Sequence, residues 1–107
     1  MQRGEVWWAN LDSSAGRRPV LLLSRNEVYT IRARVTLAPL TGTIRNIPSH
    51  VLLGPEDGLP SRCVVNLDDI VTVQKTRLIE RIVILSAHKM DAVDEAIAFA
   101  LDLKLKT

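Results

Sequence analysis

The pattern of apolar and polar positions predicts a chain built mainly of β-strands. Short runs rich in Val, Ile, Leu and Thr recur along the first two thirds of the sequence, separated by clusters of Gly, Pro, Asn, Asp and Ser that are typical of turns. The predicted strands are residues 5–11, 20–24, 33–40, 48–53, 63–65 and 70–73. With no helical crossover between them, they predict an antiparallel, barrel-like sheet of about five to seven strands.

Two of these strands have a clear expected environment. Val20 to Ser24 is a continuous apolar run with Pro19 at its entrance, where a missing N–H is tolerated, so we expect a buried central strand. Residues 33–40 alternate between two sets of positions, which is the period of a half-buried strand.

Only the C-terminal part has a helical pattern. From Ser86, a plausible N-cap, apolar residues recur at steps of three and four: Met90, Val93, Ile97 and Leu101. Phe99 and Leu103 lie off this stripe, where they can meet a second chain or pack on the chain's own sheet. A shorter helical turn is expected over residues 75–81. The expected fold class is therefore mainly β with a C-terminal helix (α+β).

Length and composition limit the class of protein. The 107 residues, 47% hydrophobic and 24% charged, fit one globular domain over residues 1–107. No apolar run approaches the roughly 18 residues of a membrane span, and no signal peptide is recognisable, so we expect a cytoplasmic protein without membrane contacts. The single cysteine, Cys63, cannot form an internal disulfide or a zinc site alone, which agrees with a reducing compartment.

Positive charge is concentrated in the first half of the chain. Residues 1–54 contain seven arginines and three acidic residues, whereas residues 55–107 contain seven basic and nine acidic residues. Guanidinium groups suit bidentate recognition of phosphate, so a polyanion is the first partner to consider. The alternative is that these arginines only keep exposed strands and loops soluble.

Common catalytic signatures are absent from the sequence, which contains no phosphate-binding Walker loop, no dinucleotide fingerprint, no nucleophile elbow and no metal-ligand cluster. His50 falls in a predicted strand and is interpreted as a surface or hydrogen-bonded histidine. Cys63 is interpreted as a small buried hydrophobic residue.

The remaining candidates for chemistry are polar residues at strand ends. Arg17 and Arg18 precede the second predicted strand, and Thr41-x-Thr43-x-Arg45 follows the third. A guanidinium beside a threonine hydroxyl provides charge, a planar donor fork and a further hydrogen bond, which together form a clamp for phosphate.

At this point several segments of the sequence match one family in order and spacing. The segments are Arg3-Gly4-Glu5-Val6-Trp7, residues 16–26 (GRRPVLLLSRN), Thr41-x-Thr43-x-Arg45, residues 60–70 (PSRCVVNLDDI), Arg77-Leu78 and Val93-Asp94-Glu95-Ala96. Together they resemble the MazF/PemK family of toxin endoribonucleases over nearly the whole chain.

The resemblance implies an SH3-like barrel of the CcdB/PemK type, a homodimer, and sequence-specific cleavage of single-stranded RNA without a metal ion or other cofactor. The implied reaction is attack of a ribose 2′-OH on the adjacent phosphorus, which leaves a 2′,3′-cyclic phosphate and a 5′-OH end. The implied RNA is messenger RNA, with ribosomal and transfer RNA as alternatives. The implied protein partner is a cognate antitoxin of the MazE type.

Site residues follow by position from the same resemblance. Arg18, directly before the proline, matches the catalytic arginine, and Thr41 matches the threonine that binds the phosphate. Thr43 lies two residues further on and competes with Thr41 for that role. The expected RNA-binding residues are Arg17, Ser14, Arg25, Thr43, Arg45 and Asp69.

One departure from the family's pattern keeps alternatives open. The loop over residues 12–17 is shorter than in many members, and no acidic residue stands next to Arg18, so no general base is evident there. Two other functions therefore remain. One is a CcdB-like toxin that binds DNA gyrase without catalysis, and the other is an inactive module that binds RNA or antitoxin.

Overall fold

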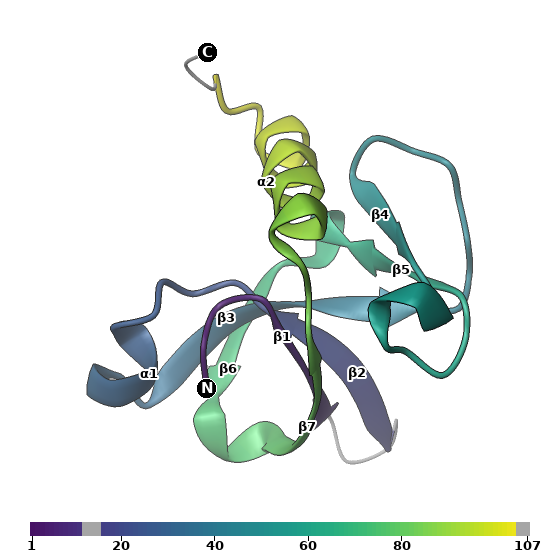
Figure 1. Cartoon of the computed structure of the whole chain (residues 1–107). Coiled ribbons are helices and arrows are strands. Elements are labelled where there is room, and N and C mark those ends of the chain that lie inside the picture. Colours follow the sequence, from purple (N-terminus) through teal and green to yellow (C-terminus); the bar gives the residue numbers. More distant parts are fainter. Residues whose placement is uncertain (12–15, 105–107) are drawn as a thin grey trace.

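The computed structural model describes residues 1–11 and 16–104 and shows a sheet with helices at two of its sides (Figure 1). In chain order, the elements are β1 (Glu5–Asn10), β2 (Arg17–Leu22), α1 (Val28–Ile31), β3 (Arg34–Thr41), β4 (His50–Leu53), η1 (Pro55–Asp57), β5 (Cys63–Asn66), η2 (Leu67–Asp69), β6 (Val71–Gln74), η3 (Lys75–Arg77), β7 (Leu78–Ile84) and α2 (Ala87–Ala100).

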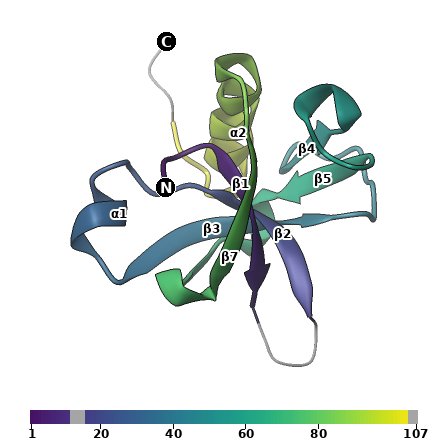
Figure 2. The ribbon, with the colours of Figure 1, turned by 60° about the horizontal axis from the view of Figure 1, so that its bottom comes forward.

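Seven strands of the described chain form one sheet in the order β4-β5-β3-β2-β1-β7, and β6 also pairs with β3. Every recorded pairing is antiparallel. β3 is the longest strand and crosses the molecule from α1 to the β4–β5 hairpin (Figures 1 and 2). Its first half pairs with β6 and its end with β5. The expected fold class, mainly β with a C-terminal helix, is confirmed.

Both faces of the β1-β2-β3 part of the sheet are buried. The α2-side core includes Leu21 and Leu40 together with Val93 of α2. The α1-side core includes Leu22 and Leu37, with Val28 and Tyr29 of α1 packed among them. Alternate residues of β2 and β3 thus enter different cores, which explains why residues 20–23 are apolar without interruption.

Two elements differ from the expectation. The helical turn expected over residues 75–81 is wrong beyond residue 77, because η3 ends there and β7 begins at Leu78. β7 pairs with β1 through two register shifts, and Ile79 is 45% exposed. Because of these shifts, apolar and polar residues do not alternate regularly along β7. The short helix α1 was not expected at all.

Helix α2 begins where the sequence indicated. The Ser86 hydroxyl accepts a hydrogen bond from the backbone N–H of Lys89 at 3.2 Å, which confirms the N-cap. Val93 is fully buried, but Leu101 is 56% exposed because the helix has ended at Ala100. Leu101 therefore does not extend the buried stripe as expected, and Phe99 and Leu103 are exposed as well.

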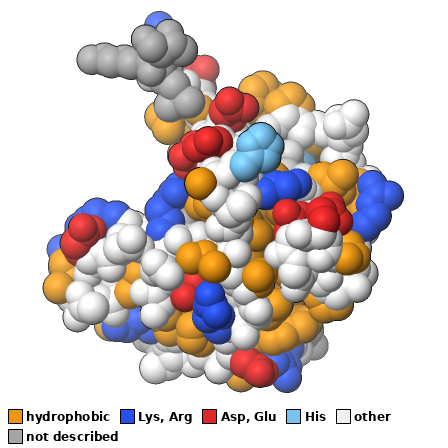
Figure 3. All heavy atoms as spheres, in the orientation of Figure 1, with side chains coloured by type: hydrophobic (Ala, Val, Ile, Leu, Met, Phe, Trp, Pro, Cys, Tyr) orange, Lys and Arg blue, Asp and Glu red, His pale blue; other side chains and the backbone are white. Residues whose placement is uncertain are grey.

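The face shown in Figure 3 mixes basic, acidic and hydrophobic side chains rather than separating them into large patches. None of the helices among the described residues has the length and apolar character needed to cross a membrane.

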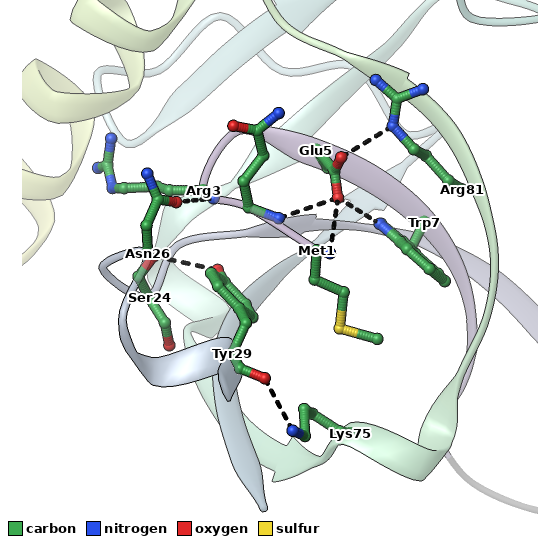
Figure 4. Close-up of polar contacts among 10 residues, drawn as sticks. Met1, Arg3, Glu5, Trp7, Ser24, Asn26, Tyr29, Lys75 and Arg81 are labelled. Atoms are coloured by element: carbon green, nitrogen blue, oxygen red, sulfur yellow. Dashed lines mark hydrogen bonds and ion pairs between the residues drawn. The ribbon is translucent and has the colours of Figure 1, made fainter. Parts of the chain in front are cut away.

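A polar network ties the first strand to the last (Figure 4). The buried carboxylate of Glu5 accepts hydrogen bonds from the indole Nε1 of Trp7 at 3.0 Å and from the Nε of Arg81 at 2.9 Å. It also accepts one from the backbone N–H of Gln2 at 3.0 Å. This network gives a structural reason for Glu5 and Trp7 in the Arg-Gly-Glu-Val-Trp segment.

Candidate active site

Arg18 and Thr41 lie at the adjoining ends of β2 and β3. The recorded β2–β3 register ends where Val20 lies opposite Pro39, two residues from Arg18 on β2 and two residues from Thr41 on β3. Pro19 and Pro39 both lack an N–H, so neither can donate to the ladder at this end of the two strands. The two residues predicted to bind the scissile phosphate therefore both lie just past the residues that pair β2 with β3.

A first concavity, the apolar hollow, has a volume of about 370 Å³ and opens beside these two residues. Most of its lining is apolar, and its basic side chains are Arg17, Arg18 and Arg62. The other lining residues are Trp8, Pro19, Leu40, Thr41, Gly42, Leu59, Pro60, Ser61, Cys63 and Ile82.

A second concavity, the polar hollow, has a volume of about 340 Å³ and shares Arg18 and Thr41 with the first. The other residues that line it are Pro39, Thr43, Arg45, Ile47, His50, Asn66, Asp68 and Asp69. Arg18 and Thr41 thus form a common rim between an apolar and a polar recess, and the polar recess also contains the predicted residues Thr43, Arg45 and Asp69.

Hydrogen bonds fix the acidic wall of the polar hollow. The amide Nδ2 of Asn66 donates to Asp69 at 3.0 Å, and the backbone N–H of Asp68 donates to the Asn66 side-chain oxygen at 3.0 Å. The Ser49 hydroxyl donates to Asp68 at 2.6 Å. Asn66, Asp68 and Asp69 therefore provide hydrogen-bonded acceptor groups in the same hollow that Arg18 and Arg45 line.

The two adjacent arginines differ in their contacts. Arg17 lies over the Trp8 ring, 5.1 Å from its centre, and forms an ion pair with Glu80 at 3.4 Å. No ion pair within the described residues uses Arg18, which is exposed. No carboxylate of the described residues therefore neutralises the charge of Arg18 at the rim. A phosphate-binding arginine needs this charge for the phosphate.

The structure distinguishes the two candidate threonines. Thr41 borders both hollows, whereas Thr43 borders only the polar one. The hydroxyl oxygen of Thr41 accepts a hydrogen bond from the backbone N–H of Thr43 at 3.2 Å. This contact fixes the oxygen while its own proton stays available for donation to a ligand.

His50 is a residue that the sequence argument did not connect to the site. It begins β4 opposite Asn66 of β5, and it is one of the residues that line the polar hollow. Its Nδ1 atom is buried without a hydrogen-bond partner among the described residues. The β4–β5 pairing that brings His50 to the site has no signature in the sequence.

Two other expected RNA contacts are not placed at this site. Arg25 is exposed in the segment before α1, beyond the far end of β2, and borders neither hollow. Ser14 lies outside the described residues.

Cys63 is half-buried at the apolar hollow, and burial, with a contribution from Asp57, raises the pKa of its thiol. The described residues contain no cluster of three or more His, Cys, Asp or Glu side chains able to hold a metal ion.

The sequence profile of the family described as "PemK-like, MazF-like toxin of type II toxin-antitoxin system" matches residues 2–101. The chain belongs to this family. It is 41% identical over 101 residues to the probable endoribonuclease MazF5 of Mycobacterium tuberculosis, a match that covers 94% of this chain and 92% of the relative. It is also 37% identical over 95 residues to the endoribonuclease MazF3 of the same species, with 89% of each chain covered.

Solved structures of PemK/MazF toxins have the same fold. The M. tuberculosis toxin MazF-mt6 superposes with a TM-score of 0.87 at 35% identity, covering 94% of this chain and 99% of the other. A mycobacterial endoribonuclease in complex with its cognate antitoxin also gives 0.87, at 33% identity and 99% coverage of both chains. The resemblance stated from the sequence motifs is confirmed.

Proposed function

We propose that this toxin is an endoribonuclease that cleaves single-stranded RNA, with the scissile phosphate bound at the rim formed by Arg18 and Thr41. The observation that carries this proposal is the placement of an exposed guanidinium, unpaired with any described carboxylate, beside a threonine hydroxyl between two recesses. The family membership and the relatives named as endoribonucleases support the same reaction class.

The main requirement of this reaction is that the negative charge on the phosphoryl oxygens is stabilised in the transition state. The ribose O2′ forms a bond to phosphorus as the 2′-OH loses its proton, and the P–O5′ bond breaks with the 5′ oxygen leaving as a hydroxyl. The Arg18 guanidinium and the Thr41 hydroxyl donate hydrogen bonds to the phosphoryl oxygens as their charge increases. Loss of one such donor in a site that excludes water typically costs roughly 3 to 4 kcal/mol in the transition state.

The two recesses suit the nucleotides on either side of the cut. In the polar hollow, Asn66 and Asp69 offer amide and carboxylate groups that can hydrogen-bond to base edges, while Arg45 contacts the backbone. The apolar hollow offers a surface of the kind on which the face of a base packs, with Arg17 and Arg62 beside it. We therefore assign sequence preference to the polar hollow.

The protein partner is an antitoxin, by analogy with the mycobacterial endoribonuclease solved with its cognate antitoxin. An acidic antitoxin segment complements Arg18 and Arg45, so we expect bound antitoxin to exclude RNA. We also propose a homodimer, since α2 and the residues after it leave Phe99, Leu101 and Leu103 more than half exposed.

The test is to incubate the purified toxin with a long unstructured RNA in the presence of EDTA and to map the ends of the fragments. The proposal predicts discrete cuts whose 3′ fragments accept a phosphate from polynucleotide kinase without prior phosphatase treatment, as 5′-OH ends do. Uncut RNA would shift the assignment to gyrase binding or to an inactive RNA-binding module. Cleavage that stops only when EDTA is added would contradict the metal-independent reaction.

A further inference from the structure

A third concavity, the basic hollow, lies away from the rim of Arg18 and Thr41. It has a volume of about 290 Å³ and shares no lining residue with the apolar or polar hollow. Its lining comes from the end of β1, the start of β3, β6 and η3: Leu11, Arg34, Thr72, Val73, Gln74 and Arg77.

Strand pairing and one hydrogen bond position Arg34 in this hollow. Arg34 lies opposite Gln74 in the β3–β6 ladder, and its Nη2 donates to the carbonyl oxygen of Thr72 at 3.2 Å. Arg77 follows Gln74 by three residues and ends η3. The Thr72 hydroxyl is within 2.8 Å of the Thr36 hydroxyl, so this side of the hollow is ordered too.

The charged side chains among the described lining residues of the basic hollow all have one sign. Arg34 and Arg77 both line it, and neither forms an ion pair with a carboxylate of the described residues. The remaining polar lining is a hydroxyl and an amide, which can donate to an anion. Two guanidinium groups facing one recess repel each other, and an oxyanion placed between them removes that repulsion and accepts hydrogen bonds from both.

β3 separates the hollow from the catalytic rim, since Arg34 begins the strand and Thr41 ends it. Seven steps of about 3.3 Å correspond to roughly 23 Å, which is several nucleotides of an extended strand.

We propose that the basic hollow binds a backbone phosphate of RNA outside the segment that is cleaved, so that the toxin holds long RNA more tightly than a minimal substrate. This inference rests on the proposed ribonuclease function. A contact of this kind contributes affinity and salt dependence but reads no sequence.

The test compares the shortest RNA that the wild-type toxin cleaves with the same RNA extended at both ends. Arg77→Gln removes one charge from the hollow. The control, Arg32→Gln, removes one charge at an exposed arginine two residues before β3 that is not among the described lining residues. KM and kcat are measured for each enzyme on both RNAs over a range of salt concentrations.

For wild-type toxin, the extended RNA should have the lower KM. Arg77→Gln should raise that KM about tenfold, weaken its salt dependence by roughly 0.7 in the log–log slope, and leave kcat and the short RNA unchanged within about twofold. Arg32→Gln should change neither KM by more than about twofold.

Several results would overturn the inference while the ribonuclease assignment stands. One is that the wild-type toxin has the same KM for both RNAs. Another is that Arg77→Gln and Arg32→Gln change the KM for the long RNA equally. A third is that Arg77→Gln raises KM equally for the short and the long RNA. Stabilisation by inorganic phosphate that Arg77→Gln abolishes, together with a KM independent of RNA length, would assign the hollow to a free anion instead. If the wild-type toxin cleaves no RNA from which such a shortest substrate can be defined, the proposed function and this inference both fail.

Discussion

The Nε of Arg81 lies 2.9 Å from the buried carboxylate of Glu5 and links β7 to β1 (Figure 4). The same carboxylate accepts a hydrogen bond from the indole N–H of Trp7, so one residue of β1 and one of β7 both bind this acidic group. Glu5→Gln keeps the shape of the side chain but removes its charge and one acceptor oxygen. We expect it to lower the free energy of unfolding by about 2 kcal/mol, measured by urea denaturation. A change below about 0.5 kcal/mol would show that the network contributes little.

Glu5 also predicts how stability depends on pH. Burial by itself raises the pKa of Glu5, but hydrogen bonds from Trp7, the Gln2 backbone and Arg81, with the nearby N-terminal ammonium, lower it below the ordinary value of 4.5. The folded state therefore binds this proton less readily than the unfolded state. Its contribution to stability is full above about pH 4.5 and is lost as the pH falls through the lowered pKa.

The measurement is the unfolding free energy of wild type and Glu5→Gln between about pH 3 and pH 6. Because Gln does not titrate, the difference between the two proteins should shrink as the pH falls. A difference that is constant over this range would contradict a lowered pKa for Glu5.

The two threonines near the rim form a matched pair for mutation. Thr41→Val removes the hydroxyl that borders both hollows, while Thr43→Val removes a hydroxyl at the polar hollow alone. We expect Thr41→Val to lower kcat/KM about 10- to 100-fold and Thr43→Val to lower it less than about threefold. The reverse order would transfer the phosphate-binding role to Thr43.

Cys63 reports on the apolar hollow. Because burial, with a smaller contribution from Asp57, raises the pKa of its thiol, little thiolate exists at neutral pH. We expect a disulfide reagent to modify native toxin at least about tenfold more slowly at pH 7.5 than the urea-unfolded chain, and the rate to increase as the pH rises past 9. Equal rates for native and unfolded protein at pH 7.5 would contradict this environment.

Much of the fold follows from the sequence because local rules and tertiary packing agree there. The apolar run after Pro19 is a central strand whose alternate residues fill two cores, and Ser86 caps the last helix. β7 was missed because its alternation is broken by two register shifts against β1. Such irregularities depend on the partner strand and leave no periodic signal in the sequence.

The candidate site was predictable in part for a similar reason. Arg18 and Thr41 each mark a strand end, and their family positions pointed to one site. The contributions of His50 and Asn66 come from pairing of β4 with β5, a long-range contact that composition and spacing do not encode. Arg25 was expected at the site but lines neither hollow, because closeness to other arginines in the sequence does not imply closeness in space.

The central claim is that the Arg18 guanidinium stabilises the reacting phosphate, and the most direct test is the cleavage rate of Arg18→Ala on an RNA that the wild-type toxin cuts. Arg18 is exposed and its described neighbours do not depend on its charge, so the variant should unfold at the wild-type temperature within about 3 °C. Arg32→Ala, which removes an exposed arginine that borders none of the three hollows, is the control. We predict a loss of about 100- to 1,000-fold in kcat for Arg18→Ala and none for the control. A folded Arg18→Ala toxin that cleaves RNA at the wild-type rate would contradict the account.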